Sequence, residues 1–213
     1  MTADGEPVLQ ALMDHINREP TESEYAAIGR VALNHTALEY QIESLIWTYM
    51  KDVDLGHIAT SGQSTDKQIQ ILKTLVEWNE PEDHVADAID WSISAFKVLR
   101  TNRNNLVHGF NFTADRKGGG LHIERRRKPL IFDSHEIVVL SNGILDGVVN
   151  DQRRLAIYLW RISMLISRRG DEHIGHDCAA PDDPTDLPSR PVMPTLLQAL
   201  PHEPPRSPHR SKG

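Results

Sequence analysis

A short stretch of basic and amide side chains around position 103 carries the groups best suited to chemistry in this chain. Between Lys97 and Phe110 the sequence reads K-V-L-R-T-N-R-N-N-L-V-H-G-F. The guanidinium of Arg103 keeps a permanent planar charge and can hold two phosphate oxygens at once. The imidazole of His108 belongs to the residue type that titrates near neutral pH, so it can accept or donate a proton. The stretch therefore predicts phosphate binding combined with proton transfer.

The geometry of these two side chains depends on where their helix ends. Residues five apart on an ideal helix differ by about 140° in azimuth and by roughly 7.5 Å along the axis, so Arg103 and His108 would diverge on a continuous helix. Gly109 is the residue type that takes the left-handed turn just past a helix end. We therefore expect His108 to lie at the helix cap, with its imidazole turned back towards Arg103. An exposed helix end with a capping histidine fits the same spacing.

Positive charge is concentrated in the same part of the chain. Residues 97–170 hold 14 Lys and Arg against 6 Asp and Glu, whereas residues 1–96 hold 5 against 17, and the whole chain has a net charge of −7. Arg100 lies four residues before Asn104, which puts both on one helical face. Four consecutive cations follow further along: Arg125, Arg126, Arg127 and Lys128. These side chains predict contacts with a nucleic-acid backbone, although the same cations also suit an exposed strand edge that resists aggregation.

The run R-N-N-L-V-H-G that starts at Arg103 resembles the signature of HEPN domains, in which an arginine is followed after four to six residues by a histidine. Arg103, Asn104 and His108 match this pattern residue by residue. The stretch that begins G-R-V-A-L-N-H at Gly29 is similar to the first long helix of that fold, and Trp91 to Leu106 is similar to its motif helix. The resemblance covers roughly residues 22 to 169.

The resemblance implies a metal-independent endoribonuclease with a composite active site at a homodimer interface, often a toxin or defence effector. It casts Arg103 and His108 as catalytic residues and Asn104 as an orienting or phosphate-binding residue. It implies RNA as the substrate, no cofactor, and the prospect of a protein antitoxin or regulator. A non-catalytic helical dimerisation or interaction module is the alternative, because fold does not fix function.

Cleavage of RNA needs few groups, since the 2'-hydroxyl is a nucleophile that the substrate itself brings. The reaction requires a base, an acid for the departing 5'-oxygen, and positive charge on the phosphorane, but no metal. One chain offers one histidine in the motif. A two-fold dimer that opposes two copies of the motif would supply two histidines and two arginines around one phosphate.

The composition of the chain excludes several other classes of protein. At 213 residues and 39% hydrophobic residues, the chain suffices for one sizeable core. The single cysteine, Cys178, excludes an internal disulfide framework and a multi-thiolate zinc site. No run of eighteen apolar residues and no signal peptide are evident, so we expect a cytoplasmic protein without a membrane span.

Apolar spacing predicts an all-α fold, an antiparallel helical bundle over residues 21–170 after an N-terminal extension at 1–20. A capping box from Thr21 to Glu24 begins a helix that reaches about Lys51, residues 52–63 read as a loop, and Ser64 or Thr65 caps a helix through Trp78. A third helix, from Glu82 to about Val107, carries the motif. Residues 110–131 read as a small hairpin. A second capping box, Asp133 with Glu136, begins the last helix, which runs to Arg169.

The composition changes after Gly170, because 9 of the 13 prolines lie in residues 171–213. This composition predicts a disordered proline-rich tail. Within it, Thr195 to Leu200 forms an apolar island that suits a short helix folding onto a partner, or an apolar patch with no partner. His173, His176 and Cys178 lack a fourth ligand, and no metal site is predicted.

Overall fold

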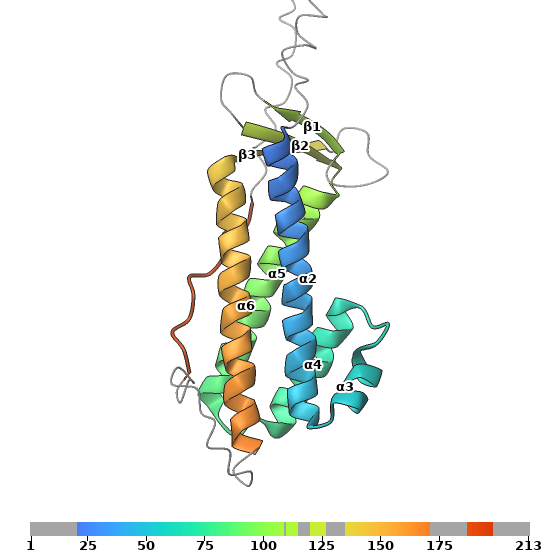
Figure 1. Cartoon of the computed structure of the whole chain (residues 1–213), viewed down its shortest axis with the longest axis vertical. Helices are drawn as coiled ribbons and strands as arrows, with labels where there is room; N and C mark the ends of the chain where they lie inside the picture. The colour runs from blue at the N-terminus through green and yellow to red at the C-terminus, as the bar shows by residue number, and fades with distance from the viewer. Residues whose placement is uncertain (1–20, 109, 115–119, 127–134, 171–186, 198–213) are drawn as a thin grey trace, which may run out of the picture. The chain divides into compact units, whose positions relative to one another are not determined.

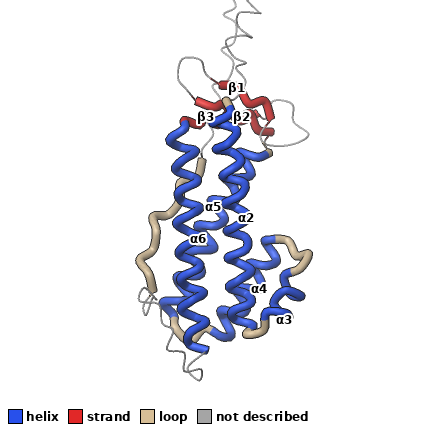
Figure 2. Tube along the Cα trace, in the orientation of Figure 1, coloured by secondary structure: helices blue, strands red, loops and turns tan. Residues whose placement is uncertain are grey.

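The computed structural model describes residues 21–108, 110–114, 120–126, 135–170 and 187–197 (Figure 1). The helices, drawn in blue in Figure 2, are α2 (Glu22–Met50), α3 (Val53–Thr60), α4 (Thr65–Asn79), α5 (Asp83–Val107) and α6 (Asn142–Gly170). The strands are β1 (Phe110–Ala114), β2 (Gly120–Arg126) and β3 (His135–Ser141). The described part of the chain is thus predominantly helical, which confirms the predicted class at this coarse level. None of its helices is both long enough and apolar enough to cross a bilayer.

The chain divides into two compact units that share three helices. The larger unit comprises Gly29–Arg103 and Asp146–Leu196, and the smaller unit comprises Met1–Ile28, Asn104–Leu145 and Leu197–Gly213. One boundary therefore falls inside α5, between Arg103 and Asn104.

The larger unit is built around apolar side chains that recur every three or four residues along its helices. The fully buried ones include Leu38, Ile42, Leu45 and Ile46 of α2, Ile69 and Leu72 of α4, Ile89, Ile93, Phe96 and Leu99 of α5, and Leu159 and Ile162 of α6. Each such side chain contributes about 1.5–3 kcal/mol through its removal from water. These side chains form the core of the larger unit.

The first long helix begins where the sequence predicts. The backbone N–H of Thr21 donates to Oε2 of Glu24 at 2.7 Å, and the backbone N–H of Glu24 donates to Oγ1 of Thr21 at 3.3 Å. Two N–H groups that the helix cannot pair are thereby satisfied, as a capping box requires. This observation confirms the predicted start of α2.

Residues 53–60 are helical, so the loop predicted over 52–63 is wrong for most of its length. Asp52 caps this helix, α3, by accepting a hydrogen bond from the backbone N–H of Leu55 at 3.0 Å. Gly56 is not a turn residue here but a packing residue, because an added Cβ would lie only 2.8 Å from Cγ of Trp47. The glycine lets α3 approach α2 closely. The presence of glycine in the sequence does not by itself distinguish a packing residue in a helix from a loop residue.

The smaller unit contains a three-stranded antiparallel sheet in the order β1-β2-β3. The third strand was not predicted. The expected capping box at Glu136 is wrong, since β3 pairs with β2 from Gly120 opposite Ser141 to Arg126 opposite His135. Residues 137–140 read I-V-V-L, and such a run suits a strand as well as a buried helix. Asp133, its partner in that prediction, lies outside the described residues.

The last helix begins later than predicted and uses a different cap. The backbone N–H of Ile144 donates to Oγ of Ser141 at 3.3 Å, and α6 starts at Asn142. Serine is a favoured residue at this position, because its hydroxyl accepts from an N–H that has no partner in the first helical turn.

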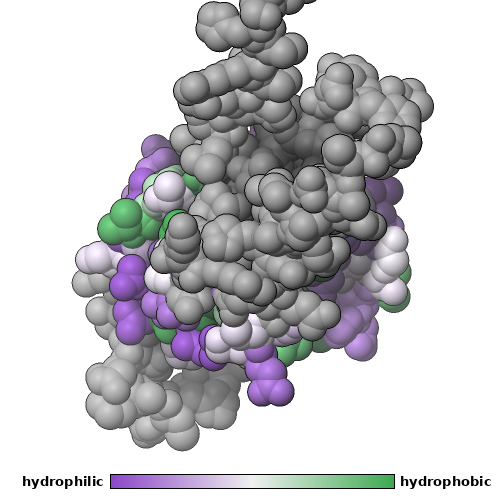
Figure 3. All heavy atoms as spheres, turned by 90° about the horizontal axis from the view of Figure 1, so that it is seen from above, coloured by the Kyte–Doolittle hydropathy of each residue, from purple (hydrophilic) through white to green (hydrophobic). Residues whose placement is uncertain are grey.

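Part of the proline-rich region has a defined course. Residues 187–197 form an extended segment without helix or strand, which runs alongside α6 in Figure 1, so the expectation of disorder is wrong for these residues. Thr195, Leu196 and Leu197 are not helical in the isolated chain, and the short segment expected to fold onto a partner stays a prediction. The rest of residues 171–213 lies outside the described residues, as does the N-terminal extension at 1–20. In the view of Figure 3, hydrophilic and hydrophobic described residues are interspersed.

Candidate functional site

Helix α5 ends where the sequence predicts. Its last residue is Val107, and the backbone N–H of His108 still donates to the carbonyl oxygen of Asn104 at 3.0 Å. His108 therefore closes the final helical turn with its backbone. Its side chain and that of Asn104 are exposed, whereas Arg103 is half-buried. Gly109 lies outside the described residues.

Two asparagines of the motif stretch belong to the buried side of α5. Asn102 and Asn105 are buried, together with Leu99 and Leu106. All four fall on one helical stripe, since they are spaced by three, three and one along the chain. No motif in the sequence marks these asparagines. Their three-residue step from Leu99 was the available signal.

A second histidine lies near the arginines of the motif. His35 of α2 is only 3% exposed and stacks on Phe96, with a distance of 5.2 Å between ring centroids. Phe96 and Arg103 are seven residues apart, so they share a face of α5. Nε2 of His35 lies 3.8 Å from Oε1 of Glu39, and its Nδ1 has no hydrogen-bond partner among the described residues.

Burial is the main reason why the pKa of His35 lies below its usual value. The carboxylate of Glu39 opposes this shift, whereas the guanidinium groups of Arg103 and Arg100 reinforce it. His35 is therefore neutral at neutral pH. The sequence alone does not mark His35 as a functional residue, because position 35 occurs within the apolar repeat of α2 without a neighbouring motif residue. Its proximity to Arg103 is a tertiary contact.

Arg100 is engaged in an ion pair. Its Nη1 lies 2.8 Å from Oδ1 of Asp66 at the start of α4. Beside it, Oγ1 of Thr65 donates to Oε1 of Glu39 at 2.9 Å. Asp66 is largely exposed, and an exposed pair contributes only about 0–1 kcal/mol. A phosphate could therefore displace Asp66 at small cost.

The remaining predicted cations belong to the smaller unit. Arg125 and Arg126 are in β2, where their Cα partners on β3 are Glu136 and His135. Arg127 and Lys128 lie outside the described residues.

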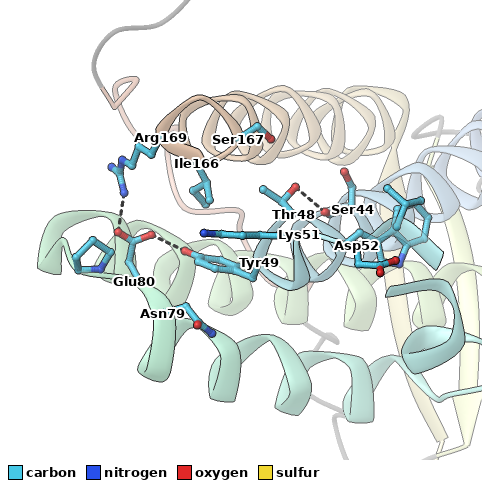
Figure 4. Close-up of a pocket in the computed structure, with 13 residues that line it drawn as sticks. Ser44, Thr48, Tyr49, Lys51, Asp52, Asn79, Glu80, Ile166, Ser167 and Arg169 are labelled. Carbon is cyan, nitrogen blue, oxygen red and sulfur yellow. Dashed lines mark hydrogen bonds and ion pairs between the residues drawn. The ribbon is translucent and has the colours of Figure 1, made fainter. Parts of the chain in front are cut away.

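A cavity of about 600 Å³ lies elsewhere in the larger unit, where α2, α4 and α6 end (Figure 4). Glu80 forms part of its wall, and its side chain is 1% exposed. Oε2 of Glu80 accepts a hydrogen bond from the Tyr49 hydroxyl at 2.6 Å, and Oε1 accepts one from Nη1 of Arg169 at 2.7 Å. Arg169 also pairs with Glu82 at 2.8 Å. Glu80 thus ties together the ends of three helices.

Burial, followed by the hydrogen bond to Glu80, raises the pKa of the Tyr49 phenol well above its usual value. Tyr49 therefore stays a hydrogen-bond donor to Glu80 and does not serve as a base. Lys51 has a φ of +54°, a left-handed conformation just past the end of α2. Its side chain extends across the cavity in Figure 4 and has no ion pair among the described residues.

No group of three or more His, Cys, Asp or Glu suited to a metal occurs within the described ranges. His173, His176 and Cys178 lie outside them. Comparison of the chain with protein-family models, curated proteins and solved structures finds no match.

Proposed function

We propose that this chain is a metal-independent endoribonuclease in which Arg103 and His108 act on one phosphodiester of RNA. The observation that carries the proposal is the end of α5 at Val107, which leaves an exposed imidazole directly after the helix and a half-buried guanidinium five residues earlier. Partial burial suits Arg103, because a charge acts more strongly where water is partly excluded. Exposure suits His108, because a proton-transfer group must reach the substrate.

The chemistry follows from these two side chains. A neutral imidazole takes the proton of the 2'-hydroxyl, whose oxygen attacks phosphorus, while a protonated imidazole gives a proton to the departing 5'-oxygen. Arg103 binds the non-bridging oxygens as negative charge accumulates on them. The products are a 2',3'-cyclic phosphate and a free 5'-hydroxyl. Asn104, exposed beside the end of the helix, supplies a further hydrogen bond to phosphate.

Two proton transfers call for two imidazoles, and the motif of one chain holds one. The proposal therefore includes a two-fold homodimer in which two copies of the motif face one phosphate. The RNA backbone is contacted by five further cations: Arg100, Arg125, Arg126, Arg127 and Lys128. A role as a toxin or defence effector, restrained by a protein antitoxin, belongs to the same proposal and rests on the resemblance to HEPN domains.

The direct test is incubation of the purified chain with end-labelled single-stranded RNA in the presence of EDTA. We expect cleavage, with products that end in a 2',3'-cyclic phosphate. DNA of the same sequence, and RNA methylated at every 2'-oxygen, should stay intact because neither has the internal nucleophile. If the chain binds RNA without cutting it, or cuts only with an added divalent ion, the proposal is wrong.

A non-catalytic interaction module is the second candidate, and exposed apolar side chains favour it. Leu33, Ile58 and Trp78 are each more than 70% exposed on α2, α3 and α4. Large exposed apolar residues are typical of docking surfaces when they lie together. An interaction module would not cleave RNA. It would bind a protein partner, and this binding would be lost when these side chains are replaced by serine.

A further inference from the structure

In the proline-rich segment 187–197, here called the strap, proline recurs at every third position. It reads L-P-S-R-P-V-M-P-T-L-L, with prolines at 188, 191 and 194. Pro188 and Pro191 are half-buried and Pro194 is buried, whereas Ser189, Arg190, Val192 and Met193 are exposed. A polyproline II helix has three residues per turn, so every third residue lies on the same side. The strap therefore turns its proline side inward.

Side chains of α5 hold the strap at two points within the larger unit. Arg190 forms an ion pair with Asp87 near the start of α5. Nδ2 of Asn102, a side chain that is 1% exposed, donates to the carbonyl oxygen of Thr195 at 2.9 Å. Asp87 precedes Asn102 on α5, just as Arg190 precedes Thr195 in the strap. The two α5 residues are separated by a rise of about 22 Å, and the strap from Arg190 to Thr195 spans roughly 16 Å when extended, so the two stretches are of comparable length. The strap therefore follows α5 in the same direction.

Aromatic side chains of α5 and α6 accompany these contacts. Trp91 of α5, four residues after Asp87, packs edge-to-face on Tyr158 of α6 at 5.6 Å between ring centroids. The Tyr158 hydroxyl is buried, and the guanidinium of Arg190 lies close enough to oppose the upward shift that burial causes in its pKa. Recognition of polyproline II peptides in general uses aromatic surfaces, and here an acidic residue that pairs with arginine lies beside them.

We propose that this face of α5 and α6 is a docking surface for a polyproline II peptide with proline at every third position and an arginine, which the strap occupies in cis and which a partner peptide of the same chemistry can take over. The strap is replaceable because one of the two contacts described above is an exposed ion pair. The Asp87 pair is exposed, and such pairs contribute only about 0–1 kcal/mol. This inference is independent of the proposed ribonuclease activity.

The test keeps the full chain and opens one peptide bond. A protease site inserted between Gly170 and Leu187 is cleaved, and a fluorescent peptide of residues 187–197 is then added. We expect the peptide to replace the cleaved strap, with a rise in fluorescence anisotropy that unlabelled peptide reverses. Peptides with glycine at 191 or 194 should bind about tenfold more weakly, because they lose the buried proline side and its preformed conformation. Glycine at the exposed positions 192 or 193 should have little effect.

A charge swap identifies the contact on α5. Asp87→Arg should weaken binding of the peptide by up to about fivefold, and a peptide carrying Arg190→Asp should recover binding to that variant. Asp90→Arg is the matched control, because Asp90 is similarly exposed on α5 but pairs with Lys73 at 2.9 Å. The inference is overturned if the cleaved chain does not take up the peptide at millimolar concentration, or if glycine has the same effect at all four positions.

Discussion

His108 is exposed at the end of α5 whereas Arg103 is half-buried, and the role proposed for each side chain depends on this difference in exposure. The exposed imidazole can reach a substrate, and histidine is the side chain suited to acid–base work at neutral pH. A half-buried guanidinium keeps its charge under all physiological conditions. Leu99 and Leu106, on the buried side of the same helix, belong to the core.

His108→Ala and Arg103→Ala should each reduce RNA cleavage by about 10²–10⁴-fold, the range for loss of a proton-transfer or charge-stabilising group. Arg103→Lys should recover little activity, because an ammonium cannot make the two-point contact with phosphate. Initial rates on labelled RNA provide the measurement, and unchanged helical circular dichroism is the control. Cleavage by His108→Ala at the wild-type rate would contradict the assignment.

His35 should make the stability of the chain sensitive to pH. Its pKa is lower in the folded chain than in the unfolded chain, so below about pH 6.5 the unfolded state binds a proton that the folded state does not. The free energy of unfolding should therefore fall as pH decreases from about 7.5 to about 5.5, by up to about 1.4 kcal/mol per pH unit from this group.

Urea unfolding at several pH values measures this effect. His35→Gln should show a shallower loss of stability on acidification than the wild type, whatever its stability at neutral pH. His84→Gln is the matched control, because His84 is an exposed histidine that lies 3.1 Å from Glu82. Equal pH slopes for His35→Gln and the wild type would show that His35 does not stay neutral in the fold.

At the scale of elements, α3 depends on a single glycine. Gly56 faces Trp47 of α2, which in turn packs on His57 at 4.1 Å between ring centroids. The indole Nε1 of Trp47 also donates to Oγ1 of Thr60 at 3.2 Å. The short helix is thus attached to α2 through one tryptophan.

Gly56→Ala should destabilise the chain by about 1–3 kcal/mol, the usual cost of inserting a group into a packed contact. Gly29→Ala should instead stabilise α2 by up to about 1 kcal/mol, because a Cβ added at Gly29 would have no other atom within 4 Å. Free energies of unfolding from urea titrations compare the two. Similar effects of both substitutions would contradict close packing at Gly56.

At the scale of the whole molecule, Glu80 fixes the ends of the helices in the larger unit. Its carboxylate binds Tyr49 of α2 and Arg169 of α6 from the connection between α4 and α5. Removing one partner from such a buried network leaves the others without compensation.

Glu80→Ala should therefore destabilise the chain by about 3–5 kcal/mol. Glu77→Ala, at an exposed position one turn earlier in the chain, should change stability by less than about 0.5 kcal/mol. Glu80→Gln should fall between them, because an amide oxygen can still accept from Tyr49 but carries no charge for Arg169. Unfolding in urea, followed by circular dichroism, ranks the three variants. A neutral effect of Glu80→Ala would show that the carboxylate does not tie the helices together.

Local patterns in the sequence were sufficient for the start of α2 and for the end of α5, but not for the start of α6. Apolar residues at steps of three and four predict one face of each helix, and the capping box at Thr21 predicts the start of α2, because these effects act within one or two turns of the chain.

Contacts between distant residues decided the rest. Residues 137–140 are compatible with a helix or a strand, and pairing with β2 makes them a strand. Gly56 reads as a loop residue until Trp47 lies against it. His35 gains its lowered pKa from burial and from cations far along the chain, and the strap acquires its course from Asp87 and Asn102. Burial and charge at these positions depend on neighbours in space, and a single sequence does not specify which residues those are.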